Sequence, residues 1–330
     1  MKCIVVKNTG DALDNLVFEE RPDMAPGPGE VAVAVSATAL NRADLLQRRG
    51  RYPAPPGIPE NVRDIPGLEF VGRVDEIGPG VTRWKSGERV FGILAAGGYA
   101  SRVITQEDLV IGVPDNLSDT DAAAVPEAFF TAFDALVLQG GMTRGDRVLI
   151  HAVGSGVGTA AVQLAGAWGA EPIGTAGSDD KLQRVGAFAR FVAINYRTTD
   201  FKTAIVERFG ENAVDIVLDV VGASYWQSNL DLLAVGGRLV LVGRLGGSDA
   251  ATPLGTVMSK RLRIIGTVMR SRTHSEKAAV TRAFDEIVVP LLRTGGVRPV
   301  VDSVFPFSQV REATARMERN ENTGKIVLAL

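Results

Sequence analysis

The chain has 330 residues, of which 45% are hydrophobic and 6% aromatic, and it contains 37 glycines. Its 36 basic and 38 acidic side chains nearly cancel, which argues against nucleic acid or an acidic membrane surface as a partner. This length is typical of about two domains, and no apolar run is long enough to span a bilayer. The N-terminal apolar stretch is too short for a signal peptide, so we expect a cytoplasmic α/β protein.

Metal-ligating side chains are scarce in this sequence. There is one cysteine, Cys3, and there are two histidines, His151 and His274. These numbers exclude an internal disulfide and a cysteine-cluster zinc site, and we predict that the protein binds no metal. The strand-like neighbours of Cys3 indicate a buried structural thiol. We interpret His151, at the end of a predicted strand, as a hydrogen-bonded packing residue.

The first third of the chain is rich in predicted strands that are punctuated by proline and glycine. A short helix opens at Asn41 and ends near Gly50, and the proline-rich loop 51–59 that follows holds one aromatic residue, Tyr52. The pattern predicts a compact, partly open barrel without regular helical crossovers. The expected strands are Cys3–Lys7, Val31–Ala37, Gly67–Ile77, Arg89–Phe91 and Ala100–Val103.

Strands and helices alternate from about Asp121 onward. After a helical stretch over Ala122–Leu138, six apolar strands alternate with helical segments, which predicts a doubly wound parallel sheet of Rossmann type. The strands are expected near Val148–His151, Pro172–Thr175, Phe191–Asn195, Asp215–Val220, Arg238–Val242 and Arg263–Thr267. The helices between them are expected near Asp179–Ala187, Phe201–Phe209, Tyr225–Ala234 and Leu254–Lys260.

The pattern breaks again after Gly295, where strand-like stretches end in the terminal GKIVLAL. This break predicts that the chain returns to its first domain. The predicted organisation is therefore a catalytic domain over residues 1–120 and 296–330, and a dinucleotide-binding domain over residues 121–295.

A glycine-rich turn follows the first strand of the alternating region. Gly156, Gly158 and Ala161 fit the G-x-G-x-x-G/A pattern between a strand and an alanine-rich helix. Small residues there allow a tight reversal and let backbone amides approach a pyrophosphate at the helix N-terminus. The context of strand, turn and helix predicts a dinucleotide cofactor.

The second strand of the sheet indicates which cofactor is bound. An NAD-binding domain usually carries an acidic residue after this strand, whereas this chain reads Thr-Ala-Gly-Ser with no acid at the tip. Ser178, Lys181 and Tyr196 offer donors and positive charge that suit a 2′-phosphate. Asp179 and Asp180 lie at a predicted helix start and are expected to point outward. We therefore predict NADPH rather than NADH, although Lys181 could also be an ordinary solvated lysine.

Several motifs together resemble one family over essentially the whole chain. They are Asn41-Arg42-Ala43-Asp44, HAVGSGVGTAAVQLA, TAGSDDKL and the closing NTGKIVL. These stretches resemble the zinc-independent quinone oxidoreductases of the medium-chain dehydrogenase/reductase superfamily. ALNRADLLQRRGRY, AVPEAFFTAFDAL and GASYWQSNL are most similar to the p53-inducible quinone oxidoreductase subgroup. The resemblance implies a GroES-like β-barrel catalytic domain around a Rossmann domain, NADPH as cofactor, and a homodimer joined through the Rossmann edge strands.

The resemblance also implies roles for individual residues. Gly156 and Val157 would face the cofactor pyrophosphate, with Gly158 in the same turn, and Asn41 and Tyr52 would border the quinone site. The 2′-phosphate would be held by Ser178, Lys181 and Tyr196. The nicotinamide ribose would lie beside Gly243, Arg244 and Leu245, and the nicotinamide ring near Thr267, Val268 and Met269. Lys325 would close over the cofactor.

Two departures from the zinc-bearing relatives agree with the scarcity of ligands. Those enzymes read Gly-His-Glu where this chain reads Gly67-Leu68-Glu69, and the four-cysteine loop is absent. Leucine cannot ligate zinc. A further departure from the quinone reductase pattern is the short loop 95–99, which would border the substrate entrance and could change the pocket size.

No histidine, cysteine or paired carboxylate is placed in the sequence as an acid–base catalyst. Reduction of a quinone by hydride needs little protein chemistry, so we expect an NADPH:quinone oxidoreductase in which Tyr52 and Asn41 position a small-molecule quinone. Asn41 could instead simply cap the helix, and Tyr52 could simply pack on the prolines. We assign no role to Glu127, which stands inside an apolar stretch.

Two other functions remain open. One is NADPH-dependent reduction of an activated double bond in an enal, enone or enoyl thioester, with Tyr52 as a candidate proton donor. The other is a non-catalytic NADPH-binding protein with a structural or RNA-associated role, which the near-neutral charge balance disfavours. The sequence leaves the physiological acceptor and the choice between one-electron and two-electron reduction undecided.

Overall fold

The computed structural model describes residues 1–330, which divide into two compact units. The first unit comprises Met1–Phe130, Met269–Gly295 and Pro299–Leu330, and the second comprises Thr131–Val268 with Gly296–Arg298. These boundaries differ from the predicted ones, because the helical segment after Met269 belongs to the first unit. There Phe284 of α10 (His274–Ile287) stacks on Phe130 with ring centroids 4.0 Å apart. Apolar packing of that helix therefore decides the boundary.

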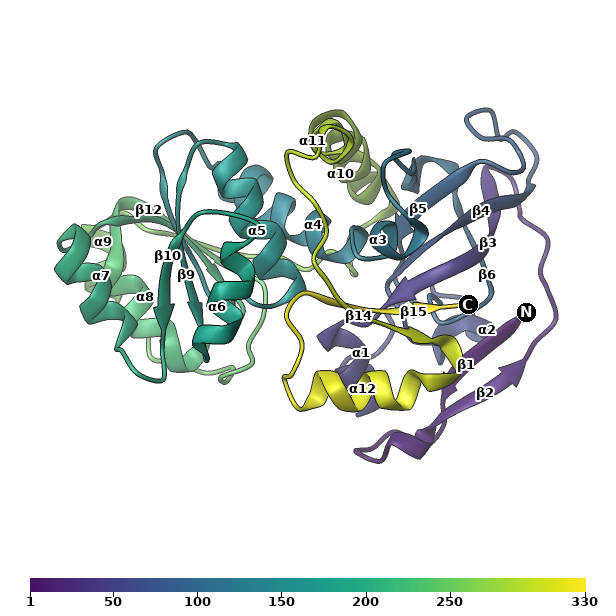
Figure 1. Ribbon diagram of the computed structural model, residues 1–330, viewed down its shortest axis with the longest axis horizontal. Helices are drawn as coiled ribbons and strands as arrows, with labels where there is room; N and C mark the ends of the chain where they lie inside the picture. The colour runs from purple at the N-terminus through teal and green to yellow at the C-terminus, as the bar shows by residue number, and fades with distance from the viewer. The chain divides into compact units, whose positions relative to one another are not determined.

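The first unit is built on a seven-stranded sheet with the order β14-β15-β3-β4-β5-β7, in which β6 also pairs with β3 (Figure 1). A separate hairpin of β1 and β2 lies outside this sheet. The predicted strands are present, and the prediction missed β2 and β7. The bounds are β1 Lys2–Val6, β2 Leu16–Glu20, β3 Glu30–Ala39, β4 Glu69–Ile77, β5 Arg89–Ile93, β6 Arg102–Gln106, β7 Val110–Gly112, β14 Val301–Pro306 and β15 Lys325–Ala329.

The C-terminal strand returns to the first unit, as predicted. β15 pairs antiparallel with β3, with Val327 opposite Ala39, and β14 lies parallel to β15 on its other side. Ile326, Val327 and Leu328 are fully buried. Two segments almost 300 residues apart thus share one core, and this pairing places Lys325 beside the end of β3.

Two helices of the first unit carry carboxyl groups of the candidate site: α1 (Arg42–Arg48) carries Asp44 and α4 (Pro126–Phe133) carries Glu127. The helical stretch predicted over Ala122–Leu138 is present, and it divides into α3 (Asp119–Ala123), α4 and a π-helical turn over Asp134–Gln139. Pro126 lacks a backbone N–H and begins a new helix. The other helices of this unit are α2 Glu60–Arg63, α11 Val289–Thr294 and α12 Val310–Glu318.

The second unit is a six-stranded parallel sheet with the order β10-β9-β8-β11-β12-β13. This order and the helical crossovers confirm the predicted doubly wound sheet. The strands are β8 Arg147–Ile150, β9 Glu171–Ala176, β10 Val192–Asn195, β11 Val214–Asp219, β12 Leu233–Leu241 and β13 Arg263–Gly266. The helices are α5 Gly156–Ala167, α6 Asp179–Gly186, α7 Phe201–Phe209, α8 Trp226–Leu232 and α9 Leu254–Ser259.

The core of the second unit lies between the sheet and its helices, where Leu149, Ile173, Val217 and Leu239 are fully buried. β13 ends the sheet at one edge, and its Ile264 is 41% exposed. The last strand of the sheet is therefore an edge with an exposed apolar side chain. None of the helices combines the length and the apolar character needed to cross a lipid bilayer.

Candidate active site

The glycine-rich turn connects β8 to α5 in the second unit. Ser155 is the N-cap of α5, and its Oγ accepts the N–H of Gly158 at 3.0 Å. A side chain at position 158 would lie 2.4 Å from the carbonyl oxygen of Ala152, so the helix can pack on this turn only with glycine. Gly156 and Val157 are partly exposed at the helix start, where N–H groups lack intrahelical partners. The free N–H groups of Gly156 and Val157 suit phosphate oxygens, whereas the buried Gly158 allows close packing of the helix. The contacts of these residues with a cofactor stay predictions.

Four side chains with hydrogen-bond donors, Ser178, Lys181, Tyr196 and Arg197, surround the tip of β9. Ser178 is the N-cap of α6 and accepts the N–H of Lys181 at 3.4 Å, so its hydroxyl already has a structural use. A Cβ at Gly154 would lie 3.3 Å from the stem of Lys181. A Cβ at Gly177 would lie 2.7 Å from the hydroxyl of Tyr196 and 3.3 Å from Nε of Arg197. The two glycines therefore let Lys181, Tyr196 and Arg197 approach the backbone; the sequence interpretation had missed Arg197.

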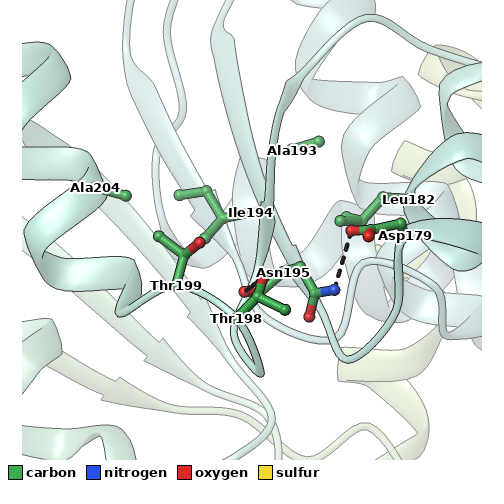
Figure 2. Close-up of a pocket in the computed structure, with 8 residues that line it drawn as sticks. All are labelled: Asp179, Leu182, Ala193, Ile194, Asn195, Thr198, Thr199 and Ala204. Atoms are coloured by element: carbon green, nitrogen blue, oxygen red, sulfur yellow. Dashed lines mark hydrogen bonds between the residues drawn. The ribbon is translucent and has the colours of Figure 1, made fainter.

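The two aspartates at the start of α6 are exposed, as expected. Asp179 accepts a hydrogen bond from Nδ2 of Asn195 at 3.0 Å (Figure 2). Asp179 and Asn195 line a hollow of about 350 Å³ beside β10 that includes none of the predicted cofactor residues. We assign the hollow no catalytic role, since its one carboxylate already has a partner.

The loops that follow β11 and β12 lie against each other at the carboxyl edge of the sheet. The N–H of Gly243 donates to the carbonyl of Asp219 at 3.2 Å, and the N–H of Leu245 donates to the carbonyl of Val220 at 3.2 Å. Arg244 and Leu245 are exposed. Ligands of doubly wound sheets bind at this edge, so the position of the loop suits the predicted ribose contacts.

The segment after β13 was predicted to border the nicotinamide ring. The hydroxyl of Thr267 is buried and donates to Oδ2 of Asp134 at 2.7 Å, so this side chain points into the protein. Val268 is 51% exposed, whereas Met269 is 8% exposed and begins the helical segment of the first unit. Of these three side chains, only Val268 is open to solvent.

His151 forms part of a closed hydrogen-bond chain in the second unit. Its Nδ1 lies 3.0 Å from Oγ1 of Thr175 and its Nε2 lies 2.8 Å from Oδ1 of Asn229. Asn229 in turn donates to Oδ2 of Asp219 at 3.1 Å. Burial lowers the pKa of His151 and favours its neutral form. The structure confirms the interpretation of His151 as a packing residue, and Cys3 is buried and structural as well.

A buried ion pair organises the first unit near the predicted acceptor site. Nζ of Lys325 donates to Oε1 of Glu69 at 2.7 Å, to Oδ1 of Asn41 at 2.5 Å and to the carbonyl of Leu40 at 2.9 Å. These acceptors engage all three ammonium hydrogens. Its predicted closure over the cofactor stays a prediction, and in this structure Lys325 holds the Glu69 network instead.

Asn41 stands at the N-cap position of α1 and forms a capping box with Asp44. Its Nδ2 donates to Oε1 of Glu69 at 2.7 Å and to the carbonyl of Ala39 at 3.3 Å. The carboxylate of Asp44 accepts the backbone N–H of Asn41 at 2.8 Å. The amide of Asn41 is thus tied to Glu69 and Lys325, and its predicted place beside a quinone stays a prediction.

Two further carboxyl groups lie in the same network. Asp44 is buried and accepts hydrogen bonds from the hydroxyl of Tyr99 at 3.0 Å and the N–H of Gly67 at 3.2 Å. Its burial raises its pKa to about 6, against the opposing effect of these hydrogen bonds. Oε2 of Glu69 accepts the backbone N–H of Glu127 at 2.8 Å. The fold thus brings Asp44, Glu69 and Glu127 together from three distant segments, which the sequence did not indicate.

Tyr52 is held by Arg270 through several contacts. The guanidinium carbon lies 4.6 Å from the centroid of the Tyr52 ring, and a guanidinium nitrogen donates to the Tyr52 carbonyl at 3.0 Å. The same guanidinium donates to the carbonyl of Ala95 at 2.6 Å and to Oε1 of Gln47 at 2.9 Å. Arg270 is only 5% exposed and had not been noticed in the sequence. It ties the Tyr52 loop, the short 95–99 loop and α1 together.

The position at which zinc-bearing relatives carry a histidine holds a buried leucine, Leu68. Across residues 1–330, no three His, Cys, Asp or Glu side chains are arranged to hold a metal ion. The residues present at this site therefore do not suit a zinc ion.

Both units of the chain match known protein families. The alcohol dehydrogenase GroES-like domain family matches residues 27–115, and the zinc-binding dehydrogenase family matches residues 156–286. The quinone oxidoreductase of Homo sapiens is 31% identical over 322 residues, which cover 95% of this chain and 94% of that protein. A mycocerosic acid synthase-like polyketide synthase of Mycolicibacterium smegmatis is 34% identical over 98% of this chain, but the chain spans only 15% of its length.

Solved structures of quinone oxidoreductases and enoyl reductases are similar to this chain over nearly its full length. A quinone oxidoreductase of Pseudomonas syringae pv. Tomato DC3000 matches with a TM-score of 0.88 and 27% identity, covering 100% of this chain and 99% of that chain. The JamJ enoyl reductase in its apo form matches with a TM-score of 0.86 and 26% identity, covering 99% and 98%. The nearer likeness to the p53-inducible subgroup stays a prediction. The chain belongs to the medium-chain dehydrogenase/reductase superfamily, a family of nicotinamide-dependent oxidoreductases that includes the quinone oxidoreductases it resembles.

Proposed function

We propose that this protein is an NADPH-dependent quinone reductase that works without a metal ion. The observation that carries the proposal is the Tyr52 ring, which is partly exposed and is held by the cation and the hydrogen bonds of Arg270. Flat aromatic molecules stack on such rings in offset geometry, so a fixed tyrosine suits a planar quinone. The near-full-length likeness to quinone oxidoreductases supports the same acceptor.

The second unit would hold the cofactor. The N–H groups of Gly156 and Val157 would take the pyrophosphate, and Lys181, Tyr196 and Arg197 would take the 2′-phosphate. The crowding of these three side chains around Gly154 and Gly177 supports this assignment, as does the engagement of Asp179 with Asn195. When bound, the nicotinamide supplies the hydride, and the protein supplies orientation.

The chain's own residues would act mainly by positioning. Arg270 fixes the face of the Tyr52 ring, and the Glu69–Lys325 pair fixes Asn41 at the start of α1. A fixed acceptor loses little further freedom when the reaction occurs, which accounts for much of the rate enhancement in such reactions.

A second candidate function is reduction of an activated carbon–carbon double bond in an enal, enone or enoyl thioester. The likeness to an enoyl reductase and to a polyketide synthase favours this alternative. Reduction of a double bond requires protonation at carbon, whereas reduction of a quinone requires protonation at oxygen only. Double-bond reduction therefore depends more strongly on an acid in the site.

Turnover of the full chain separates the two candidates. Oxidation of NADPH would be followed with a benzoquinone, a naphthoquinone and a cyclic enone, each also with NADH. We expect the largest kcat/KM with a quinone and NADPH. Faster turnover of the enone would replace the first candidate by the second, and failure of every acceptor despite NADPH binding would favour a non-catalytic role.

We also propose that the protein forms a homodimer through β13. This strand ends the second unit's sheet with unpaired backbone groups and an exposed Ile264, and such edges invite pairing with another chain. A two-fold axis at β13 would continue the sheet into a second copy. Light scattering at micromolar concentration should give a dimer mass, and a monomer mass would reject the proposal.

A further inference from the structure

In the buried network around Glu69, the Glu127 carboxyl group has no partner. No hydrogen bond or ion pair engages the Glu127 side chain, whereas Glu69 and Asp44 in the same network each accept three hydrogen bonds at their carboxylates. Glu127 is half-buried, whereas every other residue of 122–130 is buried.

The backbone around Glu127 is fixed. Its N–H donates to Oε2 of Glu69, and its neighbours Ala128 and Phe129 are 2% and 1% exposed. The same Glu69 carboxylate is held by Lys325 and Asn41. A side chain that projects from so rigid a base and has no partner of its own is free to meet a ligand.

The charged groups around Glu127 come from four other segments. They are Glu69 on β4, Lys325 on β15, Asp44 on α1 and Arg270 just before α10. Through the Glu69 carboxylate, the backbone of Glu127 is joined to the side chain of Asn41, which is one of the two residues predicted to border the acceptor site. Burial, and next the negative charge of Glu69, raise the pKa of Glu127 to about 8. The side chain therefore carries its proton at neutral pH.

We propose that Glu127 is the general acid of the reductase, an inference that rests on the function proposed above. A quinone that accepts a hydride, with its electron pair, becomes a hydroquinone anion. The O–H bond of Glu127 breaks as its proton forms a new O–H bond on the quinone oxygen, which completes the neutral hydroquinone. The Glu127 carboxylate then takes a proton from water, so two electrons and two protons have been added to the acceptor.

The first test titrates Glu127 directly in the protein without cofactor. In protein labelled with ¹³C at the glutamate carboxyl groups, one resonance should titrate near pH 8 and should be absent from the Glu127→Gln variant. If all glutamate signals of the wild type titrate in the acidic range, Glu127 is ionised at neutral pH and the proposal is rejected.

The second test measures kcat against pH at saturating NADPH and quinone. The wild-type rate should fall as pH rises through about 8, because the acid loses its proton there. Glu127→Gln should lower kcat at pH 7 by roughly 10² to 10⁴ and remove this fall, since that range is typical of general acid catalysis. Glu127→Asp should retain the fall at a reduced rate. An unchanged rate and profile in Glu127→Gln would overturn the proposal.

A matched control is Glu312→Gln, which removes an exposed glutamate from the first turn of α12, the same place that Glu127 has in α4. It should leave the rate and the pH profile unchanged. Circular dichroism and NADPH affinity of Glu127→Gln should match those of the wild type, which separates lost chemistry from lost folding.

The same variants distinguish failure of the acid from failure of the proposed acceptor. If the wild type reduces quinones and Glu127→Gln does so equally well, the role of Glu127 is wrong and the quinone assignment stands. If the wild type reduces only the enone and Glu127→Gln loses that activity with its pH dependence, the acceptor is wrong. Glu127 is then an acid that protonates carbon.

Discussion

Each unit of the protein buries a polar cluster, and the two clusters differ in whether every group is used. In the second unit, Thr175, His151, Asn229 and Asp219 form a hydrogen-bond chain. It ends where Oδ1 of Asp219 accepts the N–H groups of Val221 and Gly222 at 2.7 and 3.0 Å. Such a chain fixes the strand ends and leaves nothing to react.

The cluster of the first unit combines satisfied and unsatisfied groups. Glu69 and Lys325 are paired with each other and fully hydrogen-bonded, as the residues around His151 are. The carboxyl group of Glu127, in contrast, has no partner, and the Tyr52 ring is partly exposed. A half-buried carboxyl group without a partner loses part of its hydration and gains no hydrogen bond, which costs folding free energy, so its presence in a folded protein indicates another use. The polar groups with partners therefore stabilise the fold, whereas the groups without partners are candidates for a role in the reaction. Variants of the two kinds of group should differ in whether they change stability or activity.

The largest effect is expected from Lys325→Met. Removing the ammonium leaves the Glu69 carboxylate, which is fully buried, without its cation, and breaking a buried pair in this way costs about 3–5 kcal/mol. The free energy of unfolding in urea should fall by that amount. The double variant with Glu69→Gln should recover most of the loss because no charge remains unpaired. A loss of activity at unchanged stability would instead give Lys325 a direct role in the reaction.

The next effect concerns the open part of the cluster. Tyr52→Ala should lower kcat with a quinone by roughly a hundredfold, since a misplacement of about 1 Å can cost that much. Tyr52→Phe keeps the ring over which Arg270 lies and should keep most of kcat. A loss of about 10² or more in Tyr52→Phe would make the phenol a proton donor and would displace Glu127 from that role.

A smaller effect is expected when the closed chain is broken at His151→Phe. The ring shape survives, but Thr175 and Asn229 each lose a partner, which costs about 1–3 kcal/mol for an unsatisfied buried group. Thermal unfolding should show this loss, and kcat measured below the melting transition should be unchanged. A matching fall in kcat would mean that the closed chain also serves the reaction.

The smallest effect concerns cofactor choice. Lys181→Ala should weaken NADPH binding by about 1–3 kcal/mol, the range of a charge-assisted hydrogen bond, and should leave NADH binding nearly unchanged. The exposed Lys85→Ala in the first unit serves as control. Fluorescence titration measures both affinities. Equal losses for the two cofactors would show that Lys181 supports the packing at Gly154 rather than a phosphate.

The sequence by itself determined the features that depend on neighbouring residues. The glycine turn between a strand and a helix and the six alternating strands are contiguous patterns, and the doubly wound parallel sheet follows from them. The sequence also showed the missing acid after β9 and the leucine at position 68, since each is a single residue at a fixed place in a known motif.

Only the tertiary structure decided which polar side chains are used up and which remain open. Glu127 and Glu69 are 58 residues apart, and Lys325 lies 256 residues beyond Glu69, yet one carboxylate joins them. Arg270 reaches Tyr52 over 218 residues. Periodicity and spacing carry no information about such pairings, because they arise when β15 joins β3 and when α10 packs on α4. A lone glutamate directly after Pro126, in an otherwise apolar run, was the one local sign of the group that remains open.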